Sequence, residues 1–72
     1  MEYYEKTFRK RLKELRKEQG ISSDRLGEEI GVCGSAVRRL ERGERIPKFT
    51  EIIKLCQYFN VSQDYLTGVT DY

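Results

Sequence analysis

Small and apolar residues in the middle of the chain recur at a spacing that few arrangements of helices satisfy. With Ser23 as position 1, positions 4, 5, 8, 10, 15 and 18 are Leu26, Gly27, Ile30, Val32, Val37 and Leu40. Leu26 and Ile30 are four residues apart, on one face of a helix. Gly27 is small where a second helix would cross closely, and Gly31 suits the left-handed backbone of a tight turn. The spacing predicts two short helices joined by a sharp turn.

Two helices joined in this way form a helix-turn-helix, which presents its second helix to the major groove of DNA. We place the pair at residues 23–42 and its second helix at 34–42. At about 100° per residue, Leu40 and Glu41 stay on the same side as Val37. The residues expected on the opposite side are Ser35, Arg38, Arg39 and Arg42. The planar guanidinium group of arginine binds phosphate oxygens and the edge of guanine, so we interpret this face as a DNA-contacting surface. The alternative is an ordinary charged face exposed to solvent.

Three further helices are predicted, separated by glycine and polar capping residues. Before the pair, a helix whose apolar stripe has steps of four and three residues ends at Gly20. After it, Thr50 can cap a central helix, and Ser62 can cap a short last one. The apolar residues of the central helix are Phe49, Ile52, Ile53, Leu55, Cys56 and Phe59. The expected helices span residues 5–19, 23–30, 34–42, 50–59 and 62–68. No period-two alternation marks a strand, so we expect a single all-α domain over residues 1–72.

Composition excludes several classes of protein. The chain has no histidine and two cysteines, so we expect no metal site, no cofactor and no enzyme. No run approaches the ~18 apolar residues of a membrane span, and we expect a cytoplasmic protein with no membrane partner and no small-molecule substrate. Cys33 and Cys56 are expected to be reduced thiols. Cys33 stands at the start of the helix 34–42, where it is either a redox-sensing thiol or a small substitute for a helix cap.

Charge is distributed unevenly along the chain. The net charge is +3 over residues 1–20, +1 over residues 21–48 and −2 over residues 49–72. The basic front indicates a polyanion as partner, and the acidic tail is expected to lie away from the phosphates.

Two further groups of residues are expected to make structural contacts. Glu41 falls on the inner edge of its helix, and Arg16 falls at the edge of the apolar stripe of the first helix, so we predict an ion pair between them. The tail has more apolar and aromatic residues than a short helix can bury. We assign Val61 and Leu66 to the core of the monomer. The residues left as candidates for a homodimer interface are Tyr58, Tyr65, Val69 and Tyr72.

From Phe8 to Gly68 the chain resembles the phage-repressor type of helix-turn-helix domain, the lambda Cro/CI-like or XRE family. The resemblance is carried by Arg11-Leu12-x-x-Leu15-Arg16, Gly20-Ile21-Ser22, Leu26-x-x-x-Ile30-Gly31-Val32, Val37-x-x-Leu40-Glu41-x-Gly43, Pro47 and Val61-Ser62-x-Asp64-Tyr65-Leu66-x-Gly68. It implies a compact five-helix lambda-repressor-like domain that binds DNA as a dimer. It also implies a structural pair at the Arg16 and Glu41 positions, in agreement with the ion pair predicted above.

Carried over by position, the resemblance implies that Ser35 and Arg39 read bases and that Arg42 and Lys48 hold phosphates. Ser23 stands where the family usually has a glutamine, and Gly34 replaces a longer side chain. The complete set of candidate DNA contacts is Ser23, Ser35, Arg38, Arg39, Arg42, Arg45 and Lys48.

The sequence therefore predicts a sequence-specific DNA-binding transcriptional regulator. Of the two kinds of regulator, it favours a repressor over an activator. We expect a homodimer on an inverted repeat of double-stranded DNA, with the helix 34–42 in the major groove. The alternative is a protein-interaction module such as the antitoxin of a toxin–antitoxin pair.

Overall fold

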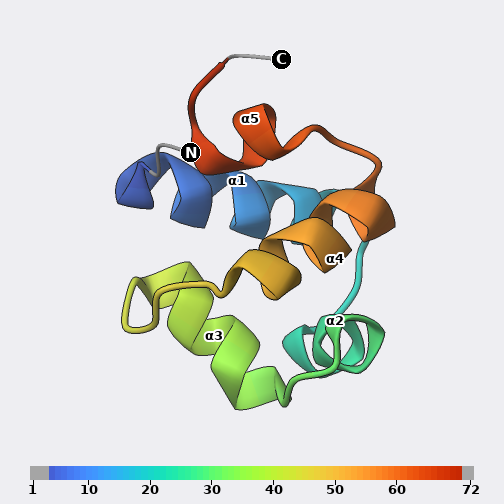
Figure 1. Ribbon diagram of the computed structural model, residues 1–72. Coiled ribbons are helices and arrows are strands. Elements are labelled where there is room, and N and C mark those ends of the chain that lie inside the picture. The colour runs from blue at the N-terminus through green and yellow to red at the C-terminus, as the bar shows by residue number, and fades with distance from the viewer. Residues whose placement is uncertain (1–3, 71–72) are drawn as a thin grey trace.

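The computed structural model describes residues 4–70, and within them the chain forms helices and no strands. The helices are α1 (Glu5–Glu18), α2 (Ser23–Ile30), α3 (Gly34–Arg42), α4 (Phe49–Phe59) and α5 (Gln63–Thr67). The predicted all-α architecture of five helices is confirmed. Figure 1 shows α2 and α3 at one end of the molecule, α5 at the other end, and α1 and α4 between them. In residues 4–70, no helix combines the length and the apolar character that a membrane crossing requires.

Local capping residues account for the helices whose bounds were predicted correctly, α2 and α3. The hydroxyl of Ser22 accepts a hydrogen bond from the backbone N–H of Arg25 at 3.0 Å, which caps the start of α2. Gly31 ends α2 and Gly43 ends α3, both in the left-handed conformation that glycine adopts most easily.

Three helices differ from the prediction at their ends. α1 ends at Glu18, one residue earlier than expected. α4 begins at Phe49 because Lys48, and not Thr50, is its N-cap: the carboxylate of Glu51 accepts the backbone N–H of Lys48 at 3.0 Å. α5 is shorter than expected, since Ser62 is its N-cap and Gly68 its C-cap.

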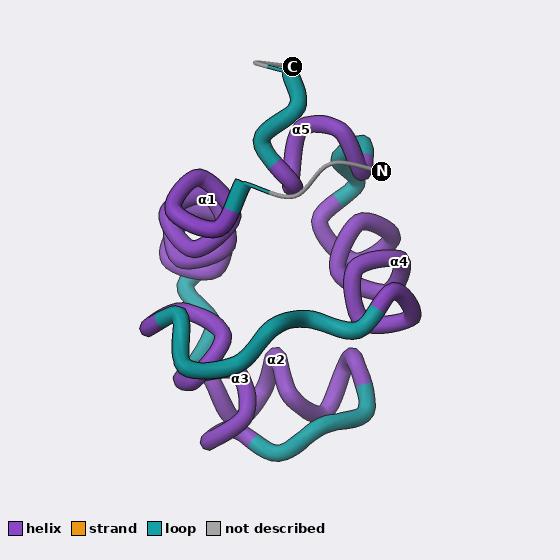
Figure 2. The backbone as a smooth tube through the Cα atoms, turned by 60° about the vertical axis from the view of Figure 1, so that its left-hand side comes forward, coloured by secondary structure: helices purple, strands orange, loops and turns teal. Residues whose placement is uncertain are grey.

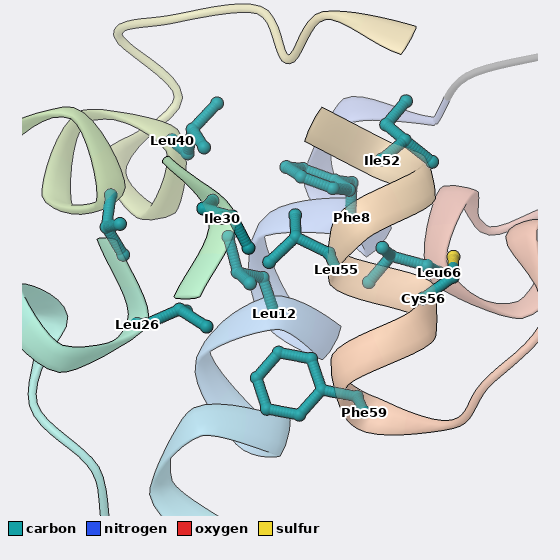
Figure 3. Close-up of a cluster of buried hydrophobic side chains, with 11 residues drawn as sticks. Phe8, Leu12, Leu26, Ile30, Leu40, Ile52, Leu55, Cys56, Phe59 and Leu66 are labelled. Atoms are coloured by element: carbon teal, nitrogen blue, oxygen red, sulfur yellow. The ribbon is translucent and has the colours of Figure 1, made fainter. Parts of the chain in front are cut away.

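The core lies where α1, α2, α3 and α4 meet, and α5 closes it. α1 packs against α3 and α5, α2 against α3 and α4, and α4 against α5. The buried apolar residues are Phe8, Leu12, Leu26, Ile30, Val37, Leu40, Ile52, Leu55, Cys56, Phe59 and Leu66, most of which are labelled in Figure 3. Phe49 was expected in the apolar arc of α4, but it is 60% exposed; burial on α4 begins at Glu51 and Ile52.

The turn between α2 and α3 explains the two glycines in the spacing pattern. Gly31 has φ 82°, a conformation in which a side chain is strained. A Cβ atom on Gly27 would lie 2.5 Å from the backbone oxygen of Val32 and 3.0 Å from the carbonyl carbon of Cys33. Because both neighbours are backbone atoms, α3 reaches its position only if residue 27 is small.

Candidate nucleic-acid interface

The two sides of α3 differ sharply in burial. Val37 and Leu40 are fully buried on the side that faces α1 and α2. The polar residues of the other side are exposed: Ser35, Arg38, Arg39 and Arg42. The side chains of Arg38 and Arg42 are 50% and 60% exposed. The structure therefore turns the arginines of α3 toward solvent. α3 itself lies at the end of the molecule opposite α5 (Figure 1).

The arginines of this face have few strong partners. Arg38 Nη1 lies 3.6 Å from Asp24 Oδ1, and Arg42 Nη2 lies 3.3 Å from Glu44 Oε1. Exposed pairs of this kind contribute roughly 0–1 kcal/mol, so a phosphate or a base can replace the carboxylate at little cost. Among the described residues, Arg39 has no ion-pair partner. Its guanidinium is the one on α3 that is free for a guanine edge without breaking a contact.

A two-point ion pair fixes α3 against α1. Arg16 Nε lies 2.6 Å from Glu41 Oε2, and Arg16 Nη2 donates to Glu41 Oε1 at 3.0 Å. The third nitrogen, Nη1, donates to the backbone oxygen of Ile21 at 3.0 Å. Both side chains are largely withdrawn from water, with 17% and 8% exposed. The hydrogen bond to Glu41 raises the pKa of Arg16 above its ordinary value. The structure thus brings together the two residues that the sequence paired.

A second contact holds the C-terminal end of α3, and sequence reasoning missed it. Arg9 Nη1 donates to the backbone oxygen of Arg42 at 3.0 Å. Carbonyls in the last turn of a helix lack partners within the helix, so a cation there is favourable. Gly43, the residue after Arg42, has φ 76°, a left-handed conformation in which a side chain is strained. The basic residues of α1 carry no signal that separates Arg9 from its neighbours.

The loop between α3 and α4 contains the last two candidate contacts, and they differ in environment. Lys48 is exposed. Arg45 pairs with Glu51, with 2.8 Å between Nη2 and Oε2, and only 26% of the Arg45 side chain is exposed. Glu51 itself was missed by sequence reasoning. A signal existed, since a glutamate three residues after a helix N-cap often accepts the N–H of the cap residue.

Comparison with known proteins identifies the family of this chain. A family model described as helix-turn-helix matches residues 12–66, which is more than half of the chain. The chain belongs to the helix-turn-helix family. It is a transcriptional regulator of the helix-turn-helix type with a repressor-like DNA-binding fold, a class that is not enzymatic. The resemblance to phage repressors and the prediction of a protein without enzymatic activity are both confirmed.

Two relatives and one solved structure show how far the similarity extends. The chain is 32% identical over 57 residues to the uncharacterized HTH-type transcriptional regulator YgzD of Bacillus subtilis, covering 79% of this chain and 86% of YgzD. It is 36% identical over 59 residues to the HTH-type transcriptional regulator ImmR of Bacillus subtilis, covering 82% of this chain but only 46% of ImmR. The P22 c2 repressor, solved in complex with synthetic operator 9T, superposes with a TM-score of 0.78 at 30% identity, covering 82% of this chain and 89% of that one.

Ser23 is placed differently from the other candidate contacts of the helix-turn-helix. It is only 9% exposed and lies where the starts of α2 and α3 meet, since a Cβ atom on Gly34 would be 3.0 Å from the Cα atom of Asp24. Ser23 is one of the residues that line a hollow, and the others are Lys13, Arg16, Arg38, Glu41 and Arg42. Ser23 is the only one of the candidate DNA contacts that is buried.

The two cysteines have opposite environments. Cys33 is the N-cap of α3 without a side-chain cap bond, and its Sγ lies 3.0 Å from the hydroxyl of Ser35. This hydrogen bond lowers the pKa of the Cys33 thiol, and the thiol is exposed. Cys56 is buried in the core, and burial raises the pKa of its thiol.

A thiol reagent is therefore expected to distinguish the two cysteines in the folded protein. Near neutral pH, a lower pKa gives Cys33 the larger thiolate fraction, and the thiolate is the reacting species. We expect brief treatment with iodoacetamide to alkylate Cys33 at least about ten times faster than Cys56, as measured by peptide mass spectrometry. The variant Cys33→Ser should be alkylated only slowly. Equal rates at both thiols would contradict the burial of Cys56.

The tail residues divide between the core and the surface. Leu66 is buried and Val61 packs against the core, as predicted. Of the interface candidates, Tyr58 packs edge-on against Phe59 with 5.1 Å between ring centroids. The guanidinium group of Arg11 lies over the ring of Tyr65, with 4.3 Å between its central carbon and the ring centroid. The remaining candidates differ: Val69 is 41% exposed, whereas Tyr72 lies outside the described residues.

Proposed function

We propose that the chain is a sequence-specific repressor that inserts α3 into the major groove of double-stranded DNA. The observation that supports this most is the exposed arginine face of α3, on a helix whose other side is fully buried and held by Arg16. A rigid helix with outward guanidinium groups can present them to base edges in one fixed orientation. The similarity to the P22 c2 repressor, which was solved with its operator, supports the choice of DNA as ligand.

Within this proposal the residues have separate roles. Ser35, Arg38 and Arg39 face base edges, because they lie on the outer side of the first two turns of α3. Arg42, at the end of α3, and Lys48, in the loop that follows, face the phosphate backbone. Phosphate contacts position the protein and base contacts specify the sequence.

We further propose that two copies bind together on an inverted repeat. One helix covers only a few base pairs, and two copies spaced by about 34 Å present two recognition helices to one face of the duplex. The interface proposed for the homodimer is the surface around Tyr58, Tyr65 and Val69. A hollow beside it is lined by Asn60, Val61, Ser62, Asp64, Tyr65 and Thr70. α5 lies at the end opposite α2 and α3, so its carboxylate, Asp64, stays away from the phosphates (Figure 2).

Selection from a pool of random DNA duplexes tests the proposal. We expect enrichment of an inverted repeat whose half-sites lie about 10 base pairs apart, centre to centre. A matched variant with Arg38, Arg39 and Arg42 replaced by alanine is expected to enrich nothing. Enrichment of a single half-site by the parent chain would contradict the dimer, and the absence of any enriched sequence would contradict sequence-specific binding.

A further inference from the structure

Glu51 is a carboxylate with only 6% of its side chain exposed, at the start of α4. A buried carboxylate is unfavourable unless both of its oxygens find partners. In Glu51 both do. Oε2 lies 2.8 Å from Arg45 Nη2, and Oε1 accepts the backbone N–H of Lys48 at 3.0 Å.

These two bonds hold the loop between α3 and α4 at two points. Arg45 lies two residues after the glycine that ends α3, and Lys48 is the residue before α4. Pro47, between them, is buried, whereas Ile46 and Lys48 are exposed. Figure 2 shows this loop passing across the molecule from the end of α3 to the start of α4. The guanidinium of Arg45 and the backbone N–H of Lys48 are directed at Glu51, and Lys48 is exposed.

We propose that Glu51 is a positioning residue for DNA binding, which acts through the loop to present Lys48 to a phosphate. This inference rests on the proposed function. It gives Arg45 a role different from the one that its charge predicted: its guanidinium bonds to Glu51 and does not bind a phosphate. A loop held at both ends loses less conformational entropy when its lysine binds DNA, so the contact is stronger than that of a lysine on a free loop.

Double-mutant cycles with Lys48→Ala test whether Glu51 acts through Lys48. The probe is a duplex of mixed sequence, because a phosphate contact does not depend on sequence. We expect Glu51→Gln to weaken binding about fivefold, the loss typical of one hydrogen bond. Lys48→Ala is expected to reduce the slope of the logarithm of the binding constant against the logarithm of salt concentration by about one. Glu51→Gln should reduce this slope by the same amount or less. In the Lys48→Ala background, Glu51→Gln should have no further effect.

Arg45→Gln is the second variant, because it removes the other partner of the pair. It leaves the buried carboxylate of Glu51 without its cation, so circular dichroism checks that the variant is folded. It should behave as Glu51→Gln does, weakening binding in the parent chain and leaving it unchanged in the Lys48→Ala background. If Arg45 bound a phosphate itself, its effect would add to that of Lys48→Ala, and Glu51→Gln would free it and tighten binding. Either result would overturn the inference.

Glu29→Gln is the matched control for charge. It removes the same unit of negative charge from α2, where Glu29 pairs with an exposed Arg25 at 3.0 Å. Any general gain in DNA binding from the lost charge appears in this control and is subtracted.

Amide hydrogen exchange in the free protein separates the inference from the proposed function. We expect Glu51→Gln to speed exchange of the Lys48 amide several-fold, while the amides in the middle of α2 keep their rates. Unchanged exchange at Lys48, or equal acceleration throughout the chain, would overturn the loop-holding role. If the parent chain binds no duplex at all, the proposed function fails. The exchange rate of the Lys48 amide still shows whether Glu51 fixes the loop between α3 and α4.

Discussion

Replacing Arg16 by methionine is expected to lower the free energy of unfolding by about 3–5 kcal/mol. The substitution removes both bonds to Glu41 and leaves a carboxylate that is only 8% exposed without its ion-pair partner. It also removes the donor to the backbone oxygen of Ile21. A small domain has only about 5 kcal/mol of stability, so most of it would be lost. Urea denaturation followed by circular dichroism measures the change.

Two further variants show whether the cause is the uncompensated charge. The double variant Arg16→Met and Glu41→Met removes both charges, so we expect it to be clearly more stable than Arg16→Met alone. Arg25→Met is the matched control, because it breaks two exposed ion pairs, with Glu29 at 3.0 Å and with Glu28 at 3.7 Å. Its expected cost is below about 1 kcal/mol. A loss for Arg16→Met as small as that of Arg25→Met would show that the pair does not hold α3 in place.

The sequence predicts most reliably the parts of this fold that neighbouring residues determine. Ser22 and Gly31 mark the ends of α2 within the segment itself, and Gly43 does the same for α3. The outward face of α3 follows from its own periodicity, since Val37 and Leu40 fix the buried side. Arg16 and Glu41 could be paired because each falls at the edge of an apolar face.

Contacts that depend on the path of a loop or on the crossing of two helices were not predictable. Arg9 reaches the oxygen of Arg42 across 33 residues of sequence, and nothing local to either residue indicates it. By sequence position alone, Arg45 and Lys48 are equivalent basic residues of the same loop. Only the folded loop shows that one faces Glu51 and the other faces solvent. Ser23 is buried in a part of α2 that meets α3, and its own helix does not reveal this contact.

Replacing Arg39 by alanine is expected to reduce the preference for the selected operator over random DNA by about 5- to 150-fold, the discrimination of one arginine that reads a guanine. Arg39 is exposed on α3 and has no ion-pair partner among the described residues, so its loss should leave the fold intact. Titration of both duplexes by fluorescence anisotropy measures the ratio of the two affinities.

Lys48→Ala and Arg39→Lys separate the reading of bases from attraction to phosphates. Lys48→Ala is expected to weaken binding to both duplexes by the same factor and to reduce the salt dependence by about one unit of slope. Arg39→Lys keeps the positive charge but lacks the planar fork that binds two atoms of guanine at once. It should therefore retain affinity for random DNA and still lose the preference for the operator. Equal losses on both duplexes for Arg39→Ala would show that Arg39 contacts only the backbone, and the assignment of base reading would pass to Arg38 and Ser35.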